Sequence, residues 1–435
     1  MLKRTSMACM VLLAAWHAWA PASARAQIAA DTLTLEQVVE RALKVSPEIV
    51  QAESSIANAQ SSERVALGNY LPSLSLSSSY GLASAERIDP ETNAIVSGSN
   101  DSYRAGLNAG VDVFTGGRRG AEMRRANAVS DAAEATLVER RFAAMASAKR
   151  AYFDVAKANE LVAVAEARLN RALEGEKAAE RRLQVGTATR SDVLRSRLEA
   201  TNARNALATA QSQYRTAAFA LGRVVGAEGP VYARPYTEKT PRPLAASDEE
   251  LARLAVEQAP MVTSANATLE SAHAASSVAR AQYLPSLRLT GGYNWFNQDP
   301  TFNDGRLSWN MGLGISYPLF NGFSREDQIS RAESTARNAT ATYADARRRA
   351  RAELERVLSA LRLAEEQIDL SRQAVEVARE DLRVQDERYK LGMSTILDRI
   401  TSQVNLMDAE RAEVAARYDY EIARAELEAL IGRSL

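Results

Sequence analysis

The chain has 435 residues, and its 54 basic and 54 acidic side chains give a formal net charge of zero. This balance gives no electrostatic reason to expect nucleic-acid binding, which requires a surplus of positive charge. Cys9, His17 and His273 are the only cysteine and histidines, and this inventory excludes the usual zinc sites and Cys/His or Ser/His/Asp catalysis. We therefore expect no enzyme activity, no cofactor and no metal site.

Residues 1–26 are predicted to be a secretory signal peptide. Two cations between Met1 and Arg4 precede an apolar stretch, and small residues follow up to Ala26. Cleavage near Gln27 would export the mature chain.

The mature sequence contains a tandem repeat of one unit. Tyr70-Leu-Pro-Ser-Leu74 recurs as Tyr283-Leu-Pro-Ser-Leu287, and the surrounding segments recur in the same order. The first repeat spans 27–226 and the second spans 248–435. Residues 227–247, with four prolines, are predicted to form an irregular linker.

Each repeat begins with two short helical patterns, which are followed by two predicted β-strands. In the first repeat the strands are expected at about 72–84 and 102–115, with a polar loop over 84–101. In the second they are expected at about 285–296 and 306–320, with a shorter loop. Apolar and polar residues alternate with a period of two, most clearly from Tyr103 to Val113.

These strands have the length and the apolar-out, polar-in pattern of a transmembrane barrel. The alternative is a soluble sandwich hairpin with one buried face. Four strands cannot close a transmembrane barrel, so the membrane interpretation requires several chains to assemble.

A long helix without an internal proline follows each strand pair, at about 119–184 and 324–390. Both contain a seven-residue apolar repeat, which is typical of helices that supercoil around partners. Each is expected to turn at a glycine, Gly186 or Gly392, and to continue as a second helix over 189–225 or 395–432.

Acidic residues follow both turns. Thr189 and Asp192, like Thr395 and Asp398, have the spacing of a helix capping box, so a purely structural role is one interpretation. In a ring of such hairpins the same carboxylates would recur by symmetry at the mouth of a central passage, where they favour cations.

Together these motifs resemble the TolC family of trimeric outer-membrane efflux and secretion channels over essentially the whole mature chain. The motifs that carry the resemblance are the paired Tyr-Leu-Pro-Ser-Leu segments, Tyr317-Pro-Leu-Phe-Asn-Gly322, Tyr389-x-x-Gly392 and Thr395-x-Leu397-Asp398. The resemblance implies a mainly α fold with a membrane β part, in which three chains form a twelve-stranded barrel continuous with a helical barrel. It also implies outer-membrane lipid, a periplasmic adaptor and an inner-membrane pump as partners.

The resemblance also assigns roles to the hairpin tips. The residues that match adaptor-docking positions are Val185, Gly186, Thr187, Leu391, Gly392 and Met393. Asp398 matches an acid that lines the periplasmic entrance, and Tyr389 and Asp192 match residues that hold the entrance shut. Ser394 stands where the family's enteric prototype has a gating arginine, and Thr401 where it has a second acid. We therefore expect fewer polar closing links and weaker cation selectivity.

Two functions follow from the sequence. The first is a passive outer-membrane duct of a tripartite efflux or type I secretion system. The alternative is a soluble periplasmic coiled-coil protein with a structural or adaptor role. The transported substrate is not encoded in a recognisable motif.

Overall fold

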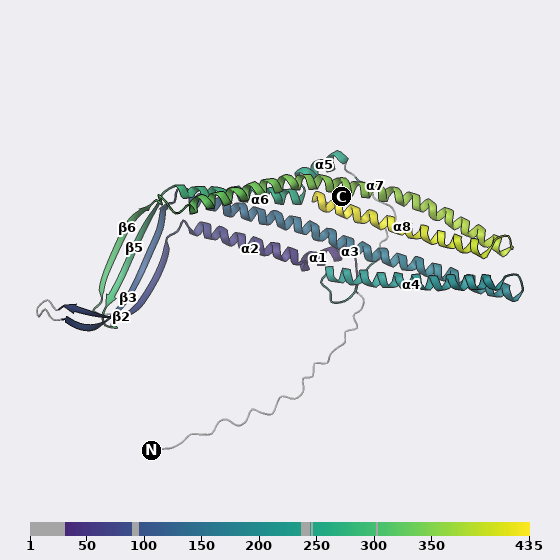
Figure 1. The fold of residues 1–435 in the computed structure, drawn as a ribbon, viewed down its shortest axis with the longest axis horizontal. Helices are drawn as coiled ribbons and strands as arrows, with labels where there is room; N and C mark the ends of the chain where they lie inside the picture. Colours follow the sequence, from purple (N-terminus) through teal and green to yellow (C-terminus); the bar gives the residue numbers. More distant parts are fainter. Residues whose placement is uncertain (1–30, 89–94, 236–243, 245–246, 302) are drawn as a thin grey trace, which may run out of the picture.

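The computed structural model describes residues 31–88, 95–235, 244, 247–301 and 303–435. The molecule is elongated, with a curved β-sheet at one end and long helices that extend from it to the other end (Figure 1). The predicted signal peptide, residues 1–26, lies outside the described residues.

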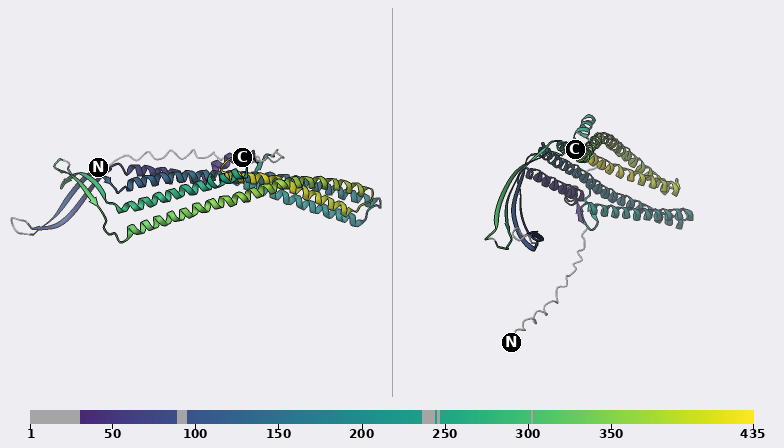
Figure 2. Two further views of the ribbon diagram at one scale, coloured as in Figure 1. Left: turned by 90° about the horizontal axis from the view of Figure 1, so that it is seen from above. Right: turned by 60° about the vertical axis from the view of Figure 1, so that its left-hand side comes forward.

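Four strands form one antiparallel sheet in the order β2 (Ser73–Ile88), β3 (Ile95–Phe114), β5 (Ser286–Asn297) and β6 (Arg306–Ser316). Each repeat contributes one hairpin, and β3 pairs with β5 to join the two hairpins. The strands β2 and β6 are therefore the two free edges of a sheet that curves along its length (Figure 2). Apolar side chains of β6 are exposed from Leu307 at 60% to Ile315 at 74%.

The first hairpin is longer than the sequence predicted. The expected polar loop over 84–101 is largely strand, because Ser84 pairs with Ser99 and the ladder continues to Ile88 and Ile95. The hydrogen bonds of a ladder join backbone groups, so pairing continues where the apolar alternation has ended. Prediction from alternation alone therefore made both strands too short at the end where the hairpin turns.

The second hairpin is shorter at its far end. Strand β5 ends at Asn297 and β6 begins at Arg306, on either side of the expected loop. Strand β6 ends at Ser316, whereas the sequence analysis extended it to residue 320. Pro318 lacks an N–H group, which explains why the ladder does not continue.

Two helices of 67 residues, α3 (Arg118–Gln184) and α7 (Ser324–Lys390), run the length of the helical part. At 1.5 Å per residue each extends about 100 Å. They form hairpins with α4 (Arg190–Val224) and α8 (Ile396–Ile431). The heptad residues of α7 are all at most 8% exposed: Leu354, Leu361, Ile368, Val375, Leu382 and Tyr389.

The two helical hairpins, α3–α4 and α7–α8, pack through different heptad positions. In α3 the smaller heptad positions Ala165, Ala172 and Ala179 are buried, whereas Leu183 is 39% exposed. Glu176 occupies an apolar position of the heptad and accepts a hydrogen bond of 3.1 Å from Arg197 of α4. The first hairpin therefore combines close alanine packing with ion pairs, and the second packs larger apolar side chains.

The helices lie side by side in a curved layer. Near the tips the order is α4, α3, α8 and α7, so α4 and α7 form the two edges. Nearer the sheet, α2 (Pro47–Gly68) and α6 (Pro260–Arg280) replace α4 and α8 as the partners of α3 and α7. Prolines at the start of α2 and α6 suit the first helical turn, where the missing N–H has no partner to lose.

The described part of the linker between the repeats contains a β-strand. The sequence analysis predicted an irregular connector over 227–247, but β4 (Val231–Ala233) pairs in parallel with β1 (Asp31–Leu33). This pairing joins segments about 200 residues apart in the sequence, so local patterns do not reveal it. Residues 236–243, 245 and 246 of the linker lie outside the described residues.

The largest core lies halfway along the helical part. The helix α1 (Leu35–Val45) and the small β1–β4 sheet pack there against α3 and α4 around Tyr152, Phe153 and Leu221. The helix α5 (Asp248–Glu257) packs in the same way against α7. Within the described residues, no helix combines the length and apolar character needed to cross a membrane.

Candidate functional site at the hairpin tips

The tip of the first hairpin is a glycine turn followed by a capped helix. Gly186 has φ of 77°, a conformation that favours glycine, and the N–H of Thr187 donates to the carbonyl of Arg182 at 2.8 Å. Thr189 then caps α4, because its N–H donates to Asp192 Oδ2 at 2.9 Å and its Oγ1 accepts from the N–H of Asp192.

The second tip repeats this geometry. Gly392 also has φ of 77°, and the N–H of Met393 donates to the carbonyl of Arg388 at 2.8 Å. The N–H of Thr395 donates to Asp398 Oδ2 at 2.9 Å. Hydrogen bonds from the Thr395 backbone and side chain hold the pKa of Asp398 below its usual range. Both acids therefore cap helices, and Asp398 remains exposed and negatively charged.

Apolar side chains project from both turns into solvent. Val185 is 73% exposed, Leu391 is 74% exposed and Met393 is 65% exposed. Backbone hydrogen bonds hold both turns, and none of the buried clusters of the described residues includes these side chains. Exposed apolar residues gathered at one end of a long molecule are typical of a docking surface.

Tyr389 is the one predicted entrance residue that lies buried between the two hairpins. It is 8% exposed, and its ring lies between two guanidinium groups, with Arg182 Cζ 4.4 Å and Arg399 Cζ 5.9 Å from the ring centre. Arg182 also donates a hydrogen bond to the backbone carbonyl of Tyr389. The cation–π contact of Arg182 therefore joins α3 to α7, and that of Arg399 joins α8 to α7 within the second hairpin.

Arg399 is fixed by two further contacts. Its Nε donates to Asp386 Oδ1 at 2.5 Å. A Cβ added to Gly175 of α3 would lie 2.6 Å from Arg399 Nη1, so a larger residue at this point would displace the guanidinium. Arg182, Gly175 and Arg399 thus lie at the contact between the hairpins near their tips, and Asp386 of α7 holds Arg399 in position within the second hairpin.

The sequence analysis did not identify these four residues. A signal was nevertheless present in the repeat, because Arg399 corresponds to Val193 in the first repeat, which is 8% exposed. A cation at the counterpart of a buried valine needs polar partners. Which partners it finds depends on how the two hairpins pack.

The remaining predicted entrance residues make only local contacts. Ser394 Oγ donates to the carbonyl of Gln385 at 3.4 Å, and Thr401 Oγ1 donates to the carbonyl of Leu397 at 2.9 Å. The Tyr389 hydroxyl has no hydrogen-bond partner in the described chain, so Asp192 does not bond to it within one protomer. The structure therefore places Tyr389 and Ser394 against the packed hairpins, and leaves Asp398 and Thr401 exposed.

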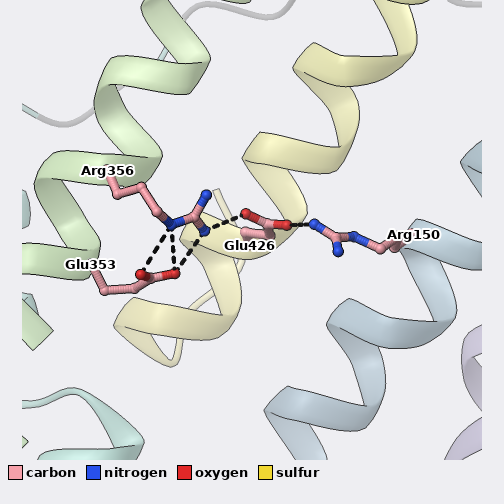
Figure 3. A network of polar contacts seen from close by, with 4 residues as sticks. All are labelled: Arg150, Glu353, Arg356 and Glu426. Carbon is pink, nitrogen blue, oxygen red and sulfur yellow. Dashed lines mark hydrogen bonds and ion pairs between the residues drawn. The ribbon is translucent and has the colours of Figure 1, made fainter. Parts of the chain in front are cut away.

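Farther from the tips, toward the sheet, a series of ion pairs that we call the ladder continues the contact between α3 and α8. The pairs follow one another toward the tips along both helices, from Lys149–Glu428 through Lys157–Asp419 to Arg171–Glu410. Figure 3 shows the branched part of this ladder, where Glu426 of α8 joins Arg150 of α3 to Arg356 of α7, which also binds Glu353. The glutamate therefore links three helices.

One ion pair of the ladder also binds a buried tyrosine. Glu160 of α3 binds Arg417 and accepts a hydrogen bond of 2.7 Å from the Tyr418 hydroxyl. Burial and the neighbouring carboxylate raise the pKa of Tyr418, so the phenol remains a hydrogen-bond donor at neutral pH. These contacts hold α3 and α8 together between the tips and the sheet, and so support the tips.

A curved sheet with an exposed apolar face, continuous with long helical hairpins, defines the class of outer-membrane channel proteins. The chain belongs to the outer membrane efflux protein family, whose model matches residues 38–227 and 251–433. The family comprises outer-membrane channels rather than enzymes. The prediction of an outer-membrane efflux duct that extends into the periplasm is thereby confirmed.

Individual relatives agree with this assignment. The chain is 25% identical over 407 residues to the pyoverdine export outer membrane protein OpmQ of Pseudomonas aeruginosa, covering 92% of this chain and 83% of that protein. It is 26% identical to the outer membrane protein TolC of Vibrio cholerae, covering 92% and 90%. The crystal structure of VceC from Vibrio cholerae has the same fold, with a TM-score of 0.79 at 23% identity, covering 92% of this chain and 96% of VceC.

Proposed function

We propose that three copies of this chain form a continuous duct that accepts substrate from a periplasmic adaptor and an inner-membrane pump. The observation that supports this proposal is that the sheet and the helical layer of one protomer both have edges without a partner. The sheet has free edges at β2 and β6, and the helical layer has free edges at α4 and α7. An open sheet edge is not tolerated in lipid, and three sheets of four strands give a closed barrel.

Adaptor docking belongs to the hairpin tips. Val185, Leu391 and Met393 are exposed apolar side chains on rigid glycine turns, at the end of the molecule farthest from the sheet. Thr187 and the two glycines shape these turns, which leaves the apolar side chains free to enter a partner's groove. This arrangement supports recognition of an adaptor hairpin by apolar contact.

The contact between the two helical hairpins of each protomer controls the entrance. Opening requires the α7–α8 hairpin to move away from α3, and the contact of Arg182 with Tyr389 would break in that movement. Asp398 supplies a ring of three charges at the mouth, and Asp192 caps the neighbouring tip. Ser394 and Thr401 add no ion pair, which fits the expectation of fewer closing links and weaker cation selectivity.

Cysteine crosslinking tests the docking proposal. Thr187→Cys and Met393→Cys, each labelled in intact cells with a short photo-crosslinker, are expected to capture a periplasmic adaptor that mass spectrometry identifies. Ser62→Cys, on the exposed face of α2 near the sheet, is the matched control. Equal capture from all three positions, or no adaptor from the tips, would contradict docking at the tips.

A further inference from the structure

One row of the sheet carries two arginines on the same face. Arg104 of β3 pairs with Phe296 of β5, and Phe296 pairs with Arg306 of β6. Residues directly opposite one another in an antiparallel ladder lie on one face of the sheet. The guanidinium carbon of Arg104 lies 5.6 Å from the centre of the Phe296 ring, which agrees with this placement. Two cations of one chain therefore share one level of the sheet.

This row lies on the polar face of the sheet, at the end farthest from the helices. Strand β5 ends at Asn297, directly after Phe296, and β6 begins at Arg306, whereas the helices join these strands at their other ends. Alternation places Leu307 and the other exposed apolar side chains of β6 on the opposite face. In a membrane barrel the apolar face meets lipid and the polar face lines the lumen. Within the proposed barrel the two arginines therefore line the lumen at its outer mouth.

The rest of the polar face gives these arginines no balancing charge. The next three rows toward the helices contain only small or neutral residues, which are Ser77, Gly106, Asn294 and Ser308, then Ser75, Asn108, Gly292 and Asn310, then Ser73, Gly110, Thr290 and Gly312. The row after them holds Asp112 and Arg288, whose side chains form an ion pair at 3.1 Å. That row is neutral, so the net charge of these five rows lies at the outer end.

Acids close by in the sequence do not neutralise the pair. Asp101 accepts a hydrogen bond of 3.1 Å from the Tyr80 hydroxyl, and the alternation of β3 places Asp101 on the opposite, apolar face. Asp299 and Asp304 lie in the turn between β5 and β6, and neither forms an ion pair with the two arginines in the part of the chain that the structure describes. The two guanidinium groups are therefore exposed cations without a counter-charge among the described residues.

Three chains would bring these cations together around one lumen. Neighbouring strands lie about 4.8 Å apart, so twelve strands tilted by about 40° give a barrel about 25 Å across. The axis then lies about 12 Å from the backbone, and arginine side chains extend into this space. Because charges act over about 10 Å at 0.1 M salt, arginines on all sides would act on ions across the whole lumen.

We propose that Arg104 and Arg306 of three chains form a ring at the outer mouth that binds multivalent anions bearing phosphate or carboxylate groups. This proposal rests on the proposed trimeric duct and adds a binding site to its outer end. Arginine presents a planar set of donors that matches both groups. Phe296 lies between the two arginines of each chain, and its ring contacts Arg104. An anion bound there relieves the repulsion between two like charges whose backbones lie about 10 Å apart.

Block of the channel by inorganic tripolyphosphate tests the ring. Purified protein is added to one side of a planar bilayer of phosphatidylcholine, which contains no anionic lipid that could compete as a source of phosphate. The long polar helices cannot cross the bilayer, so the outer mouth opens on the opposite side. Tripolyphosphate on that opposite side is expected to block the current at a concentration about tenfold lower than on the side of addition, because the ring lies at the outer mouth.

Substitution of both arginines tests which groups bind the anion. Arg104→Gln/Arg306→Gln is expected to raise the half-blocking concentration about tenfold or more, since glutamine removes the charge and keeps a polar side chain. Arg104→Lys/Arg306→Lys retains both charges and should keep most of the block. The matched control is Arg253→Gln, an exposed arginine of α5, which lies away from the sheet (Figure 1) and should leave the block unaltered.

The outcomes separate the ring from the duct. Glutamine-variant channels that conduct and are blocked as strongly as unmodified channels would overturn the ring and leave the duct intact. Unmodified protein that forms no channels and is monomeric by native mass spectrometry would overturn both.

The single variant Arg306→Gln gives a second test that does not depend on assembly of the double variant. Its side chain has no hydrogen-bond or ion-pair partner within the described residues, so its replacement should leave the fold unchanged. A several-fold weaker block is expected, and a block equal to that of the unmodified channel would overturn the role of Arg306.

Discussion

Asp398 combines a structural and an electrostatic role at the level of a single side chain. Its carboxylate caps α8 through Thr395, and the same hydrogen bonds lower its pKa. Because the folded-state pKa lies below the unfolded value, the carboxylate stabilises the folded tip at neutral pH. That contribution is lost as the pH falls through the folded-state pKa. At physiological pH the exposed group is therefore a permanent negative charge.

We predict that Asp398→Asn reduces the cation preference of the channel with little effect on assembly. Asparagine removes three charges from the proposed ring, while its side-chain oxygen can still accept the Thr395 hydrogen bond. Reversal potentials in a salt gradient across a planar bilayer measure the change. Asp408→Asn, an exposed acid farther along α8, is the matched control and should leave the preference unaltered. Equal selectivity of Asp398→Asn and the unmodified channel would refute a role at the entrance.

At the level of elements, the contact between α3 and the α7–α8 hairpin determines how the tip region can move. The upper part of this contact is a ladder of ion pairs, several of them partly buried. Near the tips the contact narrows to Arg182 of α3 with Tyr389 of α7, and to Gly175 of α3 beside Arg399 of α8. Movement of the hairpin tips therefore depends on few side chains.

We predict that Arg182→Ala increases the conductance of the channel in planar bilayers. Alanine cannot contact the Tyr389 ring as a cation or donate a hydrogen bond to the Tyr389 carbonyl, so the α7–α8 hairpin would separate from α3 more readily. The control is Arg383→Ala, which removes an exposed ion pair to Glu380 within α7 alone. A conductance for Arg182→Ala that matches this control would show that the contact does not limit opening.

The sequence predicted the elements whose residues form periodic patterns. The period of two located the strands, and the period of seven located the α7 seam from Leu354 to Tyr389. The far ends of β2 and β3 and the β1–β4 pairing were missed, because backbone pairing over a distance leaves no local pattern. Arg182 and Arg399 were missed for the same reason, since their partners lie on other helices.

At the level of the whole molecule, the protomer is an incomplete part of a ring. Its sheet and its helical layer each end in two free edges. The two repeats differ at the edges where the ring must close. Helix α3 binds α8 inside the protomer, whereas α7 lies at a free edge of the helical layer. The duplication thus supplies two similar hairpins with different partners.

The mass of the native complex tests this account most directly. Protein extracted from outer membranes in mild detergent should give, by native mass spectrometry, a complex of three mature chains that begin near Gln27. A single chain recovered from the periplasmic extract, with none in the outer membrane, would contradict the channel and the ring together.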